Sequence, residues 1–330
     1  MKRVWGIWVH VALLGVASTT AWFMSARTVE PNLTNGPAFD VWRVEAEQVQ
    51  SIVLETPERR VTVEPKHDSL GNYAVVSLEN QPKSEHSDAG AADKTTSEKK
   101  HFISVDAAEK VRQGLARFRA LLTIGKIDAK RATDFGLDKP EGTLRVGLAG
   151  GPRVLTIGAS TPGGGNYYAR DEKTGLVHVV VGEPIATLMY AEGRMVERDL
   201  HGFKTDEVTR LAVQAGGRRR QLVRVVNRPN GWADTDSASK EDETASNWVG
   251  KLMQLRVTSY EEKFQNTPTP IVRVEYGDTK TNLGFIEIFR VQGSKDLTRY
   301  VVKSERSRWF AEVMKSQAEQ LERDVSLIAK

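Results

Sequence analysis

The sequence VQSIVLETPERR at residues 49–60 returns in altered form, as VTRLAVQAGGRR, at residues 208–219. In both stretches apolar residues alternate with polar ones ahead of a turn and a pair of arginines. This is the pattern of a strand with one buried face that leads into a hairpin. A repeat determines the fold of the whole chain, because each copy must build the same supersecondary unit.

Further landmarks follow in the same order in both copies. The helical stripe Val111–Phe118 returns as Trp248–Leu255, but after 137 positions instead of the 159 that separate the opening strands. The difference of 22 falls on Glu79–His101, a polar stretch that can bury little and that indicates an insertion in the first copy. The later matches are Pro140 with Pro270 and Glu197–Asp199 with Glu322–Asp324. The ordered series predicts a duplication.

Each copy is predicted to be an α+β module of short antiparallel strands with packed helices, because hydrophobic periods of two and of 3.6 alternate along it. In the first copy we expect a helix over Val105–Leu122, capped by Ser104, and a closing helix from Pro184. The closing helix of the second copy is expected over Phe310–Leu321. The expected strands are 49–55, 60–64, 73–77, 143–148, 153–157, 167–170, 177–181, 271–276, 283–289 and 298–302.

The amino-terminal stretch Val4–Ala26 is apolar, uncharged and long enough to cross a ~30 Å hydrocarbon layer. Lys2 and Arg3 precede it, so the positive-inside rule leaves residues 1–3 in the cytoplasm and the rest of the chain on the periplasmic side of a bacterial inner membrane. A cleaved signal peptide is the alternative interpretation. The expected organisation is an anchor at 4–26, a linker at 27–48, and modules at 49–203 and 208–330.

Composition limits the function classes. The 330 residues include no cysteine, which excludes disulfide scaffolds, thiol nucleophiles and cysteine-based zinc sites. A net charge of +4 gives no argument for nucleic-acid binding, which export would also disfavour. The six histidines lack the spacing of zinc ligands, although a catalytic dyad can still assemble through tertiary contacts. They are His10, His67, His86, His101, His178 and His201.

Two motifs have both a functional and a structural interpretation. Asp134-Phe135-Gly136 is the metal-binding tripeptide of kinases, but the other kinase motifs are missing from the sequence. It therefore predicts a turn between helix and strand, with Gly136 at positive φ and Pro140 leading into the strand. Gly163-Gly164-Gly165 is similar to a phosphate-binding loop, but no Gly-Lys-Ser/Thr follows, so a hairpin is predicted. No catalytic, metal-binding or cofactor-binding residue is assigned.

The landmarks of the first copy resemble those of the bacterial family DUF4340. They are Asp134-Phe135-Gly136-Leu137-Asp138-Lys139-Pro140, Ile157-Gly158, Tyr167-Tyr168-Ala169-Arg170 and Arg198-Asp199, within Val49–Phe203. The second copy departs from this pattern, with Gln265–Pro270 in place of the first motif. The resemblance implies an exported, membrane-anchored module, often encoded beside ABC-transporter components linked to gliding motility. It supplies no catalytic residues.

The residues to which a role is assigned fall into two groups. Arg198-Asp199 and Arg323-Asp324 follow helical patterns in both copies, so we expect them to fix a helix to the sheet through ion pairs or hydrogen bonds. Aromatic and arginine side chains dominate many interfaces, so others are candidate contact surfaces. These are Tyr167, Tyr168, Arg218, Arg219, Arg220, Arg224 and Arg228. The alternative for the arginines is that they are solvated side chains of a hairpin.

The sequence favours a non-enzymatic, membrane-anchored scaffold or accessory subunit of an envelope complex. The resemblance suggests an ABC-type transporter or a gliding-motility assembly as that complex. A second interpretation is a module that binds a cell-wall glycan or another envelope ligand in a cleft between the copies. A third is a hydrolase, which needs a convergent acid, base or metal constellation.

Overall fold

The computed structural model describes residues 38–81, 99–264, 268–292 and 297–329. The expected anchor at 4–26 lies outside these residues, as do residues 27–37 of the expected linker and the middle of the Glu79–His101 stretch. Among the helices of the described ranges, none combines the length and the apolar character that a membrane crossing requires.

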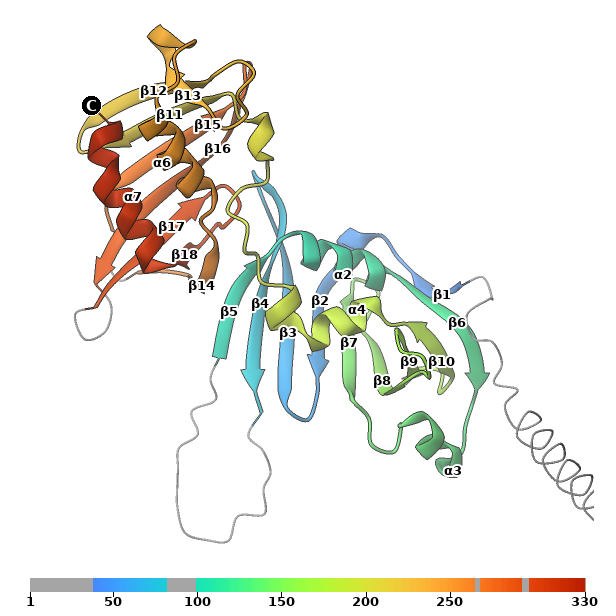
Figure 1. Ribbon diagram of the computed structural model, residues 1–330. Coiled ribbons are helices and arrows are strands. Elements are labelled where there is room, and N and C mark those ends of the chain that lie inside the picture. The colour runs from blue at the N-terminus through green and yellow to red at the C-terminus, as the bar shows by residue number, and fades with distance from the viewer. Residues whose placement is uncertain (1–37, 82–98, 265–267, 293–296, 330) are drawn as a thin grey trace, which may run out of the picture.

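Two antiparallel sheets account for most of the described chain (Figure 1). The first has ten strands in the order β1-β6-β10-β9-β8-β7-β2-β3-β4-β5. They are β1 (Phe39–Arg43), β2 (Val49–Glu55), β3 (Arg59–Asp68), β4 (Gly71–Asn80), β5 (Lys99–Ser104), β6 (Arg117–Gly125), β7 (Gly142–Leu148), β8 (Arg153–Ser160), β9 (Asn166–Asp171) and β10 (Val177–Val181). Its helices are α2 (Asp106–Ala116), α3 (Ala129–Ala132), α4 (Glu183–Met189) and α5 (Ala191–Arg194).

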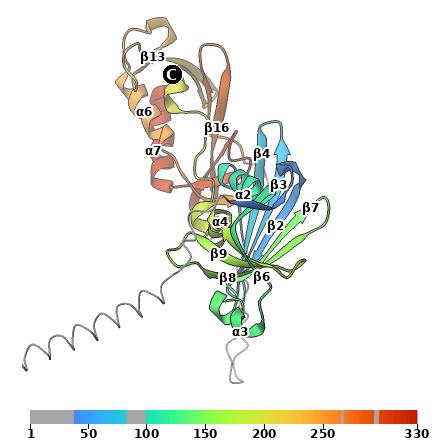
Figure 2. The ribbon, with the colours of Figure 1, turned by 90° about the vertical axis from the view of Figure 1, so that its right-hand side faces the viewer.

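The second sheet has eight strands in the order β13-β12-β11-β15-β16-β17-β18-β14. They are β11 (Arg210–Ala215), β12 (Arg218–Arg224), β13 (Trp232–Asp234), β14 (Val257–Glu261), β15 (Val272–Gly277), β16 (Asn282–Gln292), β17 (Thr298–Ser304) and β18 (Phe310–Val313). The helices α6 (Glu243–Met253) and α7 (Lys315–Ile328) pack side by side on one face of this sheet (Figure 2). Short 3-10 helices occupy 46–48, 133–135, 205–207 and 235–237.

The two sheets share one topology. Read from β14 to β13, the second sheet repeats the order of the first from β6 to β4. The register agrees too, because the pair Ile52–Val63 recurs as Leu211–Leu222, 159 positions later. The first sheet has β1 and β5 in addition, one at each edge. The α+β class is confirmed, and we call residues 38–203 module 1 and residues 208–329 module 2.

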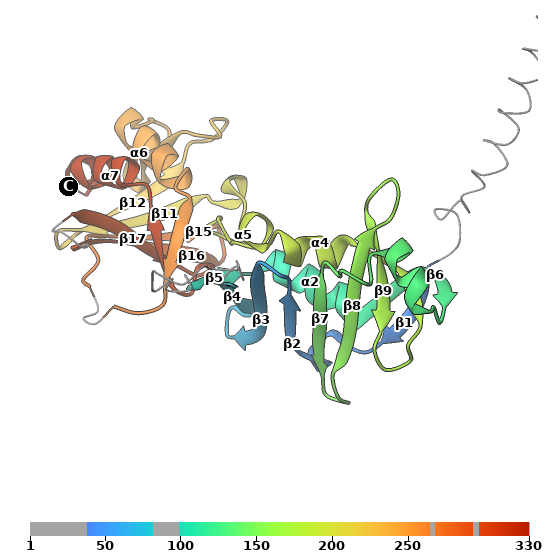
Figure 3. The same cartoon turned by 90° about the horizontal axis from the view of Figure 1, so that it is seen from below.

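Each sheet buries the apolar residues of one face beneath its longer helices, α2 and α4 in module 1 and α6 and α7 in module 2, which lie on the same side in both modules (Figure 3). In module 1 the strand residues Ile52 and Leu54 meet Val111 and Leu115 of α2. The core of module 2 contains Trp248, which is 1% exposed and donates from Nε1 to the Leu321 carbonyl of α7 at 3.1 Å. Burial of this kind is the main source of stability in such two-layer folds.

The first helix is shorter than the expected Val105–Leu122. α2 ends at Ala116, and β6 follows directly, with Phe118 and Ala120 buried and Arg117 and Arg119 exposed. This segment forms a strand and not a helix because a strand places Phe118 and Ala120 on the same face, in the core that α2 covers. Ser104 is the last residue of β5 and does not cap α2, which begins after Val105.

The expected linker at 27–48 contains the edge strand β1. Trp42 fixes this strand, because its ring stacks on Phe118 at 4.5 Å and its Nε1 donates to the Leu115 carbonyl at 2.7 Å. Two other expected boundaries are also wrong. Both ends of the Glu79–His101 stretch belong to strands β4 and β5, and Phe310–Val313 forms β18 ahead of α7.

Candidate functional site

The segment Asp134–Pro140 forms a packing turn on the face of the first sheet that looks away from α2. Gly136 ends a 3-10 helix at φ +65°, as expected, and a Cβ there would lie 2.7 Å from the backbone nitrogen of Ala159. The Phe135 carbonyl lies so close to Gly158 that no Cβ fits between them. Pro140 is exposed and stands two residues before β7. The tripeptide is therefore a structural turn.

Tyr167 and Tyr168 do not form a common contact surface. They are consecutive residues of β9, so their side chains point to opposite faces of the sheet. Tyr168 meets the Phe135 ring edge-on at 4.9 Å, and Tyr167 packs at Gly182, where a Cβ would lie 2.8 Å from its ring. Burial raises the pKa of Tyr167. Both tyrosines are half-buried packing residues.

Module 2 fills the corresponding place with aromatic side chains. Phe264 and Phe289 both meet Phe310 edge-on, at 4.9 and 5.3 Å. Phe289 occupies the position of Gly158, since the registers of β16 and β8 correspond at 131 positions. The second copy was expected to lack the Asp134–Pro140 motif. Its sheet is covered on the corresponding face by phenylalanine side chains instead.

The arginine-rich hairpin divides into structural and exposed side chains. Arg220 donates to Asp234 at 2.6 Å and to Asp242 at 2.7 Å, and these hydrogen bonds raise its pKa. Burial alone would raise the pKa of Asp242, but the bonds from Arg220 and from the Ala245 N–H outweigh it and lower that pKa. Arg220 therefore links β12 to the start of α6 and cannot meet a partner.

Arg224 and Arg228 also serve the fold of module 2. Arg224 donates to the Val208 carbonyl at 2.7 Å and lies over the Trp232 ring at 5.0 Å, while Arg228 pairs with Glu241. Arg218 and Arg219 are exposed beside the hairpin turn. Of the expected basic surface, these two remain exposed to a partner, although Arg219 shares its charge with Glu275.

Replacing Arg220 with alanine is expected to lower the free energy of unfolding by about 2 kcal/mol, because two carboxylates lose charged hydrogen bonds. Arg218→Ala is the matched control from the same hairpin, and a change within about 0.5 kcal/mol is expected there. Chemical denaturation of the full-length protein measures both. Equal effects of the two variants would contradict the division of the hairpin into structural and exposed arginines.

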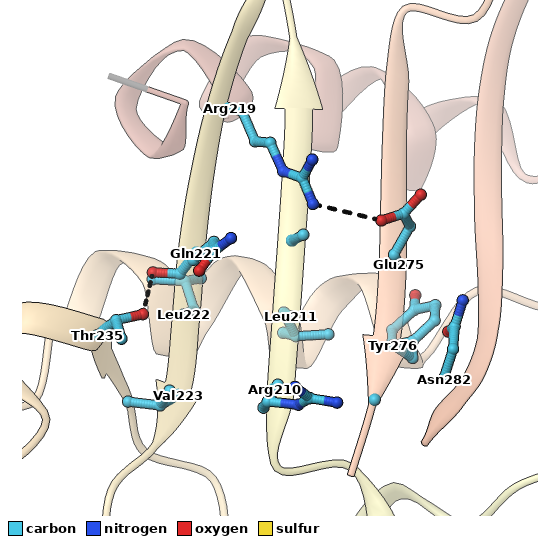
Figure 4. Close-up of a pocket in the computed structure, with 12 residues that line it drawn as sticks. Arg210, Leu211, Arg219, Gln221, Leu222, Val223, Thr235, Glu275, Tyr276 and Asn282 are labelled. Atoms are coloured by element: carbon cyan, nitrogen blue, oxygen red, sulfur yellow. Dashed lines mark hydrogen bonds and ion pairs between the residues drawn. The ribbon is translucent and has the colours of Figure 1, made fainter. Parts of the chain in front are cut away.

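Arg219 borders a depression of about 420 Å³ on the face of the second sheet away from α6 and α7 (Figure 4). Exposed Arg210 and Arg219 stand on neighbouring strands, and Arg219 lies 3.6 Å from Glu275. The other polar residues that line the depression are Gln221, Thr235 and Asn282. Sequence reasoning missed Arg210, although it alternates with the buried Leu211 and so had to lie on the open face. We call this surface the arginine depression.

A second polar centre lies where the modules meet. Arg306, in the turn between β17 and β18, donates to Glu197 at 2.8 Å and to Asp106 of α2 at 2.6 Å. Glu197 is only 9% exposed and Arg306 only 14%. Burial alone would lower the pKa of Arg306, but the two carboxylates raise it. Each buried charge at this junction is thus paired across the modules.

The same turn makes a second contact with module 1. Arg308 donates to Asp68 at 3.2 Å, and its guanidinium lies 4.9 Å above the Tyr73 ring. Its φ of +54° is uncommon for a residue other than glycine. The connecting segment adds two backbone bonds, from the Glu197 N–H to Ile103 of β5 and from the Val257 N–H of β14 to Arg198. Main-chain and side-chain contacts therefore join the two sheets.

Arg198-Asp199 and Arg323-Asp324 do not fix a helix to a sheet as expected. Arg198 is exposed after α5, and Asp199 meets Arg256 at 3.5 Å between exposed side chains. Arg323 is exposed on α7, where Asp324 joins α6 through Lys251 at 3.1 Å. The reason is that β18 follows β10 by 133 positions, so these two pairs, 125 positions apart, are not structural counterparts.

Among the described histidines, His201 has a carboxylate partner that sequence spacing could not reveal. Its Nδ1 lies 3.1 Å from Glu305, which also accepts the Phe285 N–H, and its ring contacts the rings of Phe203 and Tyr276. Its Nε2 is buried without a hydrogen-bond partner among the described residues. His178 is buried against Thr123, and this burial lowers its pKa. Across the described ranges, no three His, Asp or Glu residues converge as metal ligands.

Comparison with known proteins gives one match. The family model "Domain of unknown function (DUF4340)" matches residues 105–273, which is half of the chain. The match begins at α2 and ends in β15, so it crosses the junction instead of covering the expected Val49–Phe203. No curated protein and no solved structure gives a significant match.

Proposed function

The chain belongs to the DUF4340 family, and from this premise we propose that it is a non-enzymatic, membrane-anchored scaffold or accessory subunit of an envelope complex. Residues 4–26 hold it in the inner membrane, with the amino terminus in the cytoplasm and both modules in the periplasm. Its partner is a protein subunit of a membrane complex, and we favour an ABC-type transporter or a gliding-motility assembly.

The observation that supports this proposal most is the paired junction between the modules. A scaffold must hold its binding surface in a constant orientation relative to its attachment point. Arg306 and Arg308 connect the β17–β18 turn to three separate parts of module 1, namely Asp68, Asp106 and the segment at Glu197. Because a buried charge without its partner is strongly unfavourable, these contacts resist independent rotation of the modules.

The arginine depression is the surface that the scaffold offers to its partner. Arg210 and Arg219 present guanidinium groups that suit the carboxylates of an acidic protein segment. The depression opens on the face away from the helices (Figure 4), so docking there would leave the core of module 2 intact.

The test is isolation of the full-length protein from its native membrane in mild detergent, comparing the wild type with the double variant Arg210→Glu and Arg219→Glu. We expect specific membrane-complex subunits to be recovered with the wild type. The amount recovered with the charge-reversed protein should be at least about tenfold lower. Arg218→Glu controls for non-specific charge. The proposed function would be contradicted if the wild-type protein were isolated without other subunits, or if all three proteins recovered the same amount of them.

Ligand binding between the modules is the second candidate, because depressions of about 320 and 390 Å³ adjoin Arg306. These volumes reach the lower range of small-molecule sites. The larger one is lined by Leu70 and Val105 of module 1 and by Leu283 and Phe285 of module 2. Saturable quenching of tryptophan fluorescence by cell-wall fragments would favour this candidate over the scaffold.

A further inference from the structure

The chain enters module 1 at the end farthest from module 2. β1 runs antiparallel to β6, with Phe39 opposite Ala120 and Arg43 opposite Arg117. Residue 38 therefore lies toward the carboxyl end of β6. This end of β6 and the short helix α3 lie together at the far side of module 1 (Figure 1). The tether from the amino-terminal apolar segment must arrive there.

This end of the molecule carries exposed apolar and cationic side chains. Phe39 is 40% exposed and Leu122 39%. A Cβ on Gly175 would lie 3.8 Å from Lys126, so the β9–β10 turn with Lys173 adjoins Lys126. We define the distal tip by its exposed residues, which are Phe39, Leu122, Lys126, Lys130, Arg131 and Lys173.

Several carboxylates near the distal tip already have intramolecular partners. Asp128 accepts the Arg131 N–H as the cap of α3, and Asp171 accepts the Lys173 N–H. Glu172 accepts from Arg170 and Thr156. Backbone N–H groups do not cancel the charges of Asp128 and Asp171, and the exposed Asp134 nearby adds a third, so the four cations of the distal tip exceed these three carboxylates by one positive charge. Lys126, Lys130 and Lys173 form no ion pair with any described residue, so their charges are open to an external anion.

The tether is short. Twelve residues, 27–38, separate the apolar segment from Phe39, and even fully extended they reach only about 40 Å. As a flexible chain they would span about 20 Å. The distal tip thus stays at high effective concentration beside the bilayer, where even weak contacts are populated.

We propose that the distal tip docks on the anionic lipid surface of the membrane that holds the amino-terminal segment. The inference rests on the anchor of the proposed function. The ammonium groups meet anionic headgroups, and Phe39 and Leu122 enter the headgroup level, so charge and apolar contacts act together. Docking at this end places module 2, which carries the arginine depression, at the end of the molecule away from the bilayer (Figure 1).

The absence of cysteine allows a site-specific test in the full-length protein. Thr174→Cys places an environment-sensitive fluorophore in the tip without removing a cation, and Val226→Cys places it on exposed module 2 as a control. Both proteins are reconstituted into vesicles with brominated lipid, made of phosphatidylcholine alone or with phosphatidylglycerol. We expect the label at 174 to be quenched only when phosphatidylglycerol is present, and the label at 226 in neither case.

Charge reversal at Lys126→Glu and Lys130→Glu is expected to reduce quenching at 174 to the level at 226, as should high salt. Alkaline carbonate extraction of the same vesicles reports separately on the anchor. If the protein resists extraction but the labels at 174 and 226 show equally low quenching, the proposed docking of the distal tip on lipid is wrong, while the proposed scaffold function is unaffected. A protein released by carbonate overturns the anchor and, with it, this inference.

Discussion

Gly158→Ala is expected to be among the most destabilising single-methyl changes in module 1, with a loss of about 3 kcal/mol in the free energy of unfolding. The added Cβ would overlap the Phe135 carbonyl, which is backbone and cannot rotate away, and would press on the Leu137 side chain. The whole turn at Asp134–Pro140 would have to lift from β8. Phe135 would then lose its edge-on contact with Tyr168.

The matched control is Gly150→Ala in the turn between β7 and β8. A Cβ at Gly150 has no neighbour within 4 Å, and its φ is not in the left-handed region. This variant should be neutral or more stable by up to about 1 kcal/mol, because alanine restricts the unfolded chain. Calorimetry of the two full-length variants should show a melting temperature about 6–12 °C lower for Gly158→Ala alone. A Gly158→Ala protein that melts with the wild type would show that the turn does not pack on β8.

Strands with one buried face were predictable from the sequence, because their period of two survives in any context. The meander from β7 to β10 matches the expected strands within a few residues, and Gly163–Gly165 forms its hairpin with positive φ throughout. The end of α2 was not predictable, since Phe118 fits the helical stripe and the strand alternation equally well. Tertiary pairing with β1 and β10 decides the matter.

The arginine hairpin shows where a repeat contains more information than a single motif. Arg220 corresponds to Val61, a core residue, and both pair with a buried residue on the neighbouring strand. A cation at a position that is apolar in the other copy indicates a carboxylate partner within reach of the buried position. That partner, Asp242, could not be identified from the sequence, because Arg220 reaches it through a tertiary contact with the cap of α6.

The junction between the modules was beyond sequence analysis for the same reason. Glu197 and Arg306 are 109 positions apart, and nothing local distinguishes either from a solvated charge. The conspicuous neighbours Arg198 and Asp199 are exposed, whereas the buried Glu197 makes the decisive contact. Repetition of a short polar motif is therefore weak evidence for a structural role unless its spacing follows the strand register.

Arg306→Ala is expected to uncouple the modules at a cost of about 3 kcal/mol, because it leaves the buried Glu197 without its cation. Differential scanning calorimetry of the full-length protein should then show separate transitions for the two modules, whereas a single coupled transition is expected for the wild type. Arg256→Ala is the control, since its pair with Asp199 lies between exposed side chains and should contribute less than about 1 kcal/mol.

A second substitution separates two contributions to the lost stability, namely the missing ion pair and the unfavourable free energy of a buried charge without a partner. Adding Glu197→Gln to Arg306→Ala removes that charge while preserving the shape of the side chain, so part of the lost stability should return. If the double variant regains stability but its two modules still unfold separately, Arg306 orients the modules and contributes little net stability. An Arg306→Ala protein that unfolds as the wild type does would instead leave orientation to Arg308 and the backbone bonds of the connecting segment, and the ion-pair account of the scaffold would be wrong.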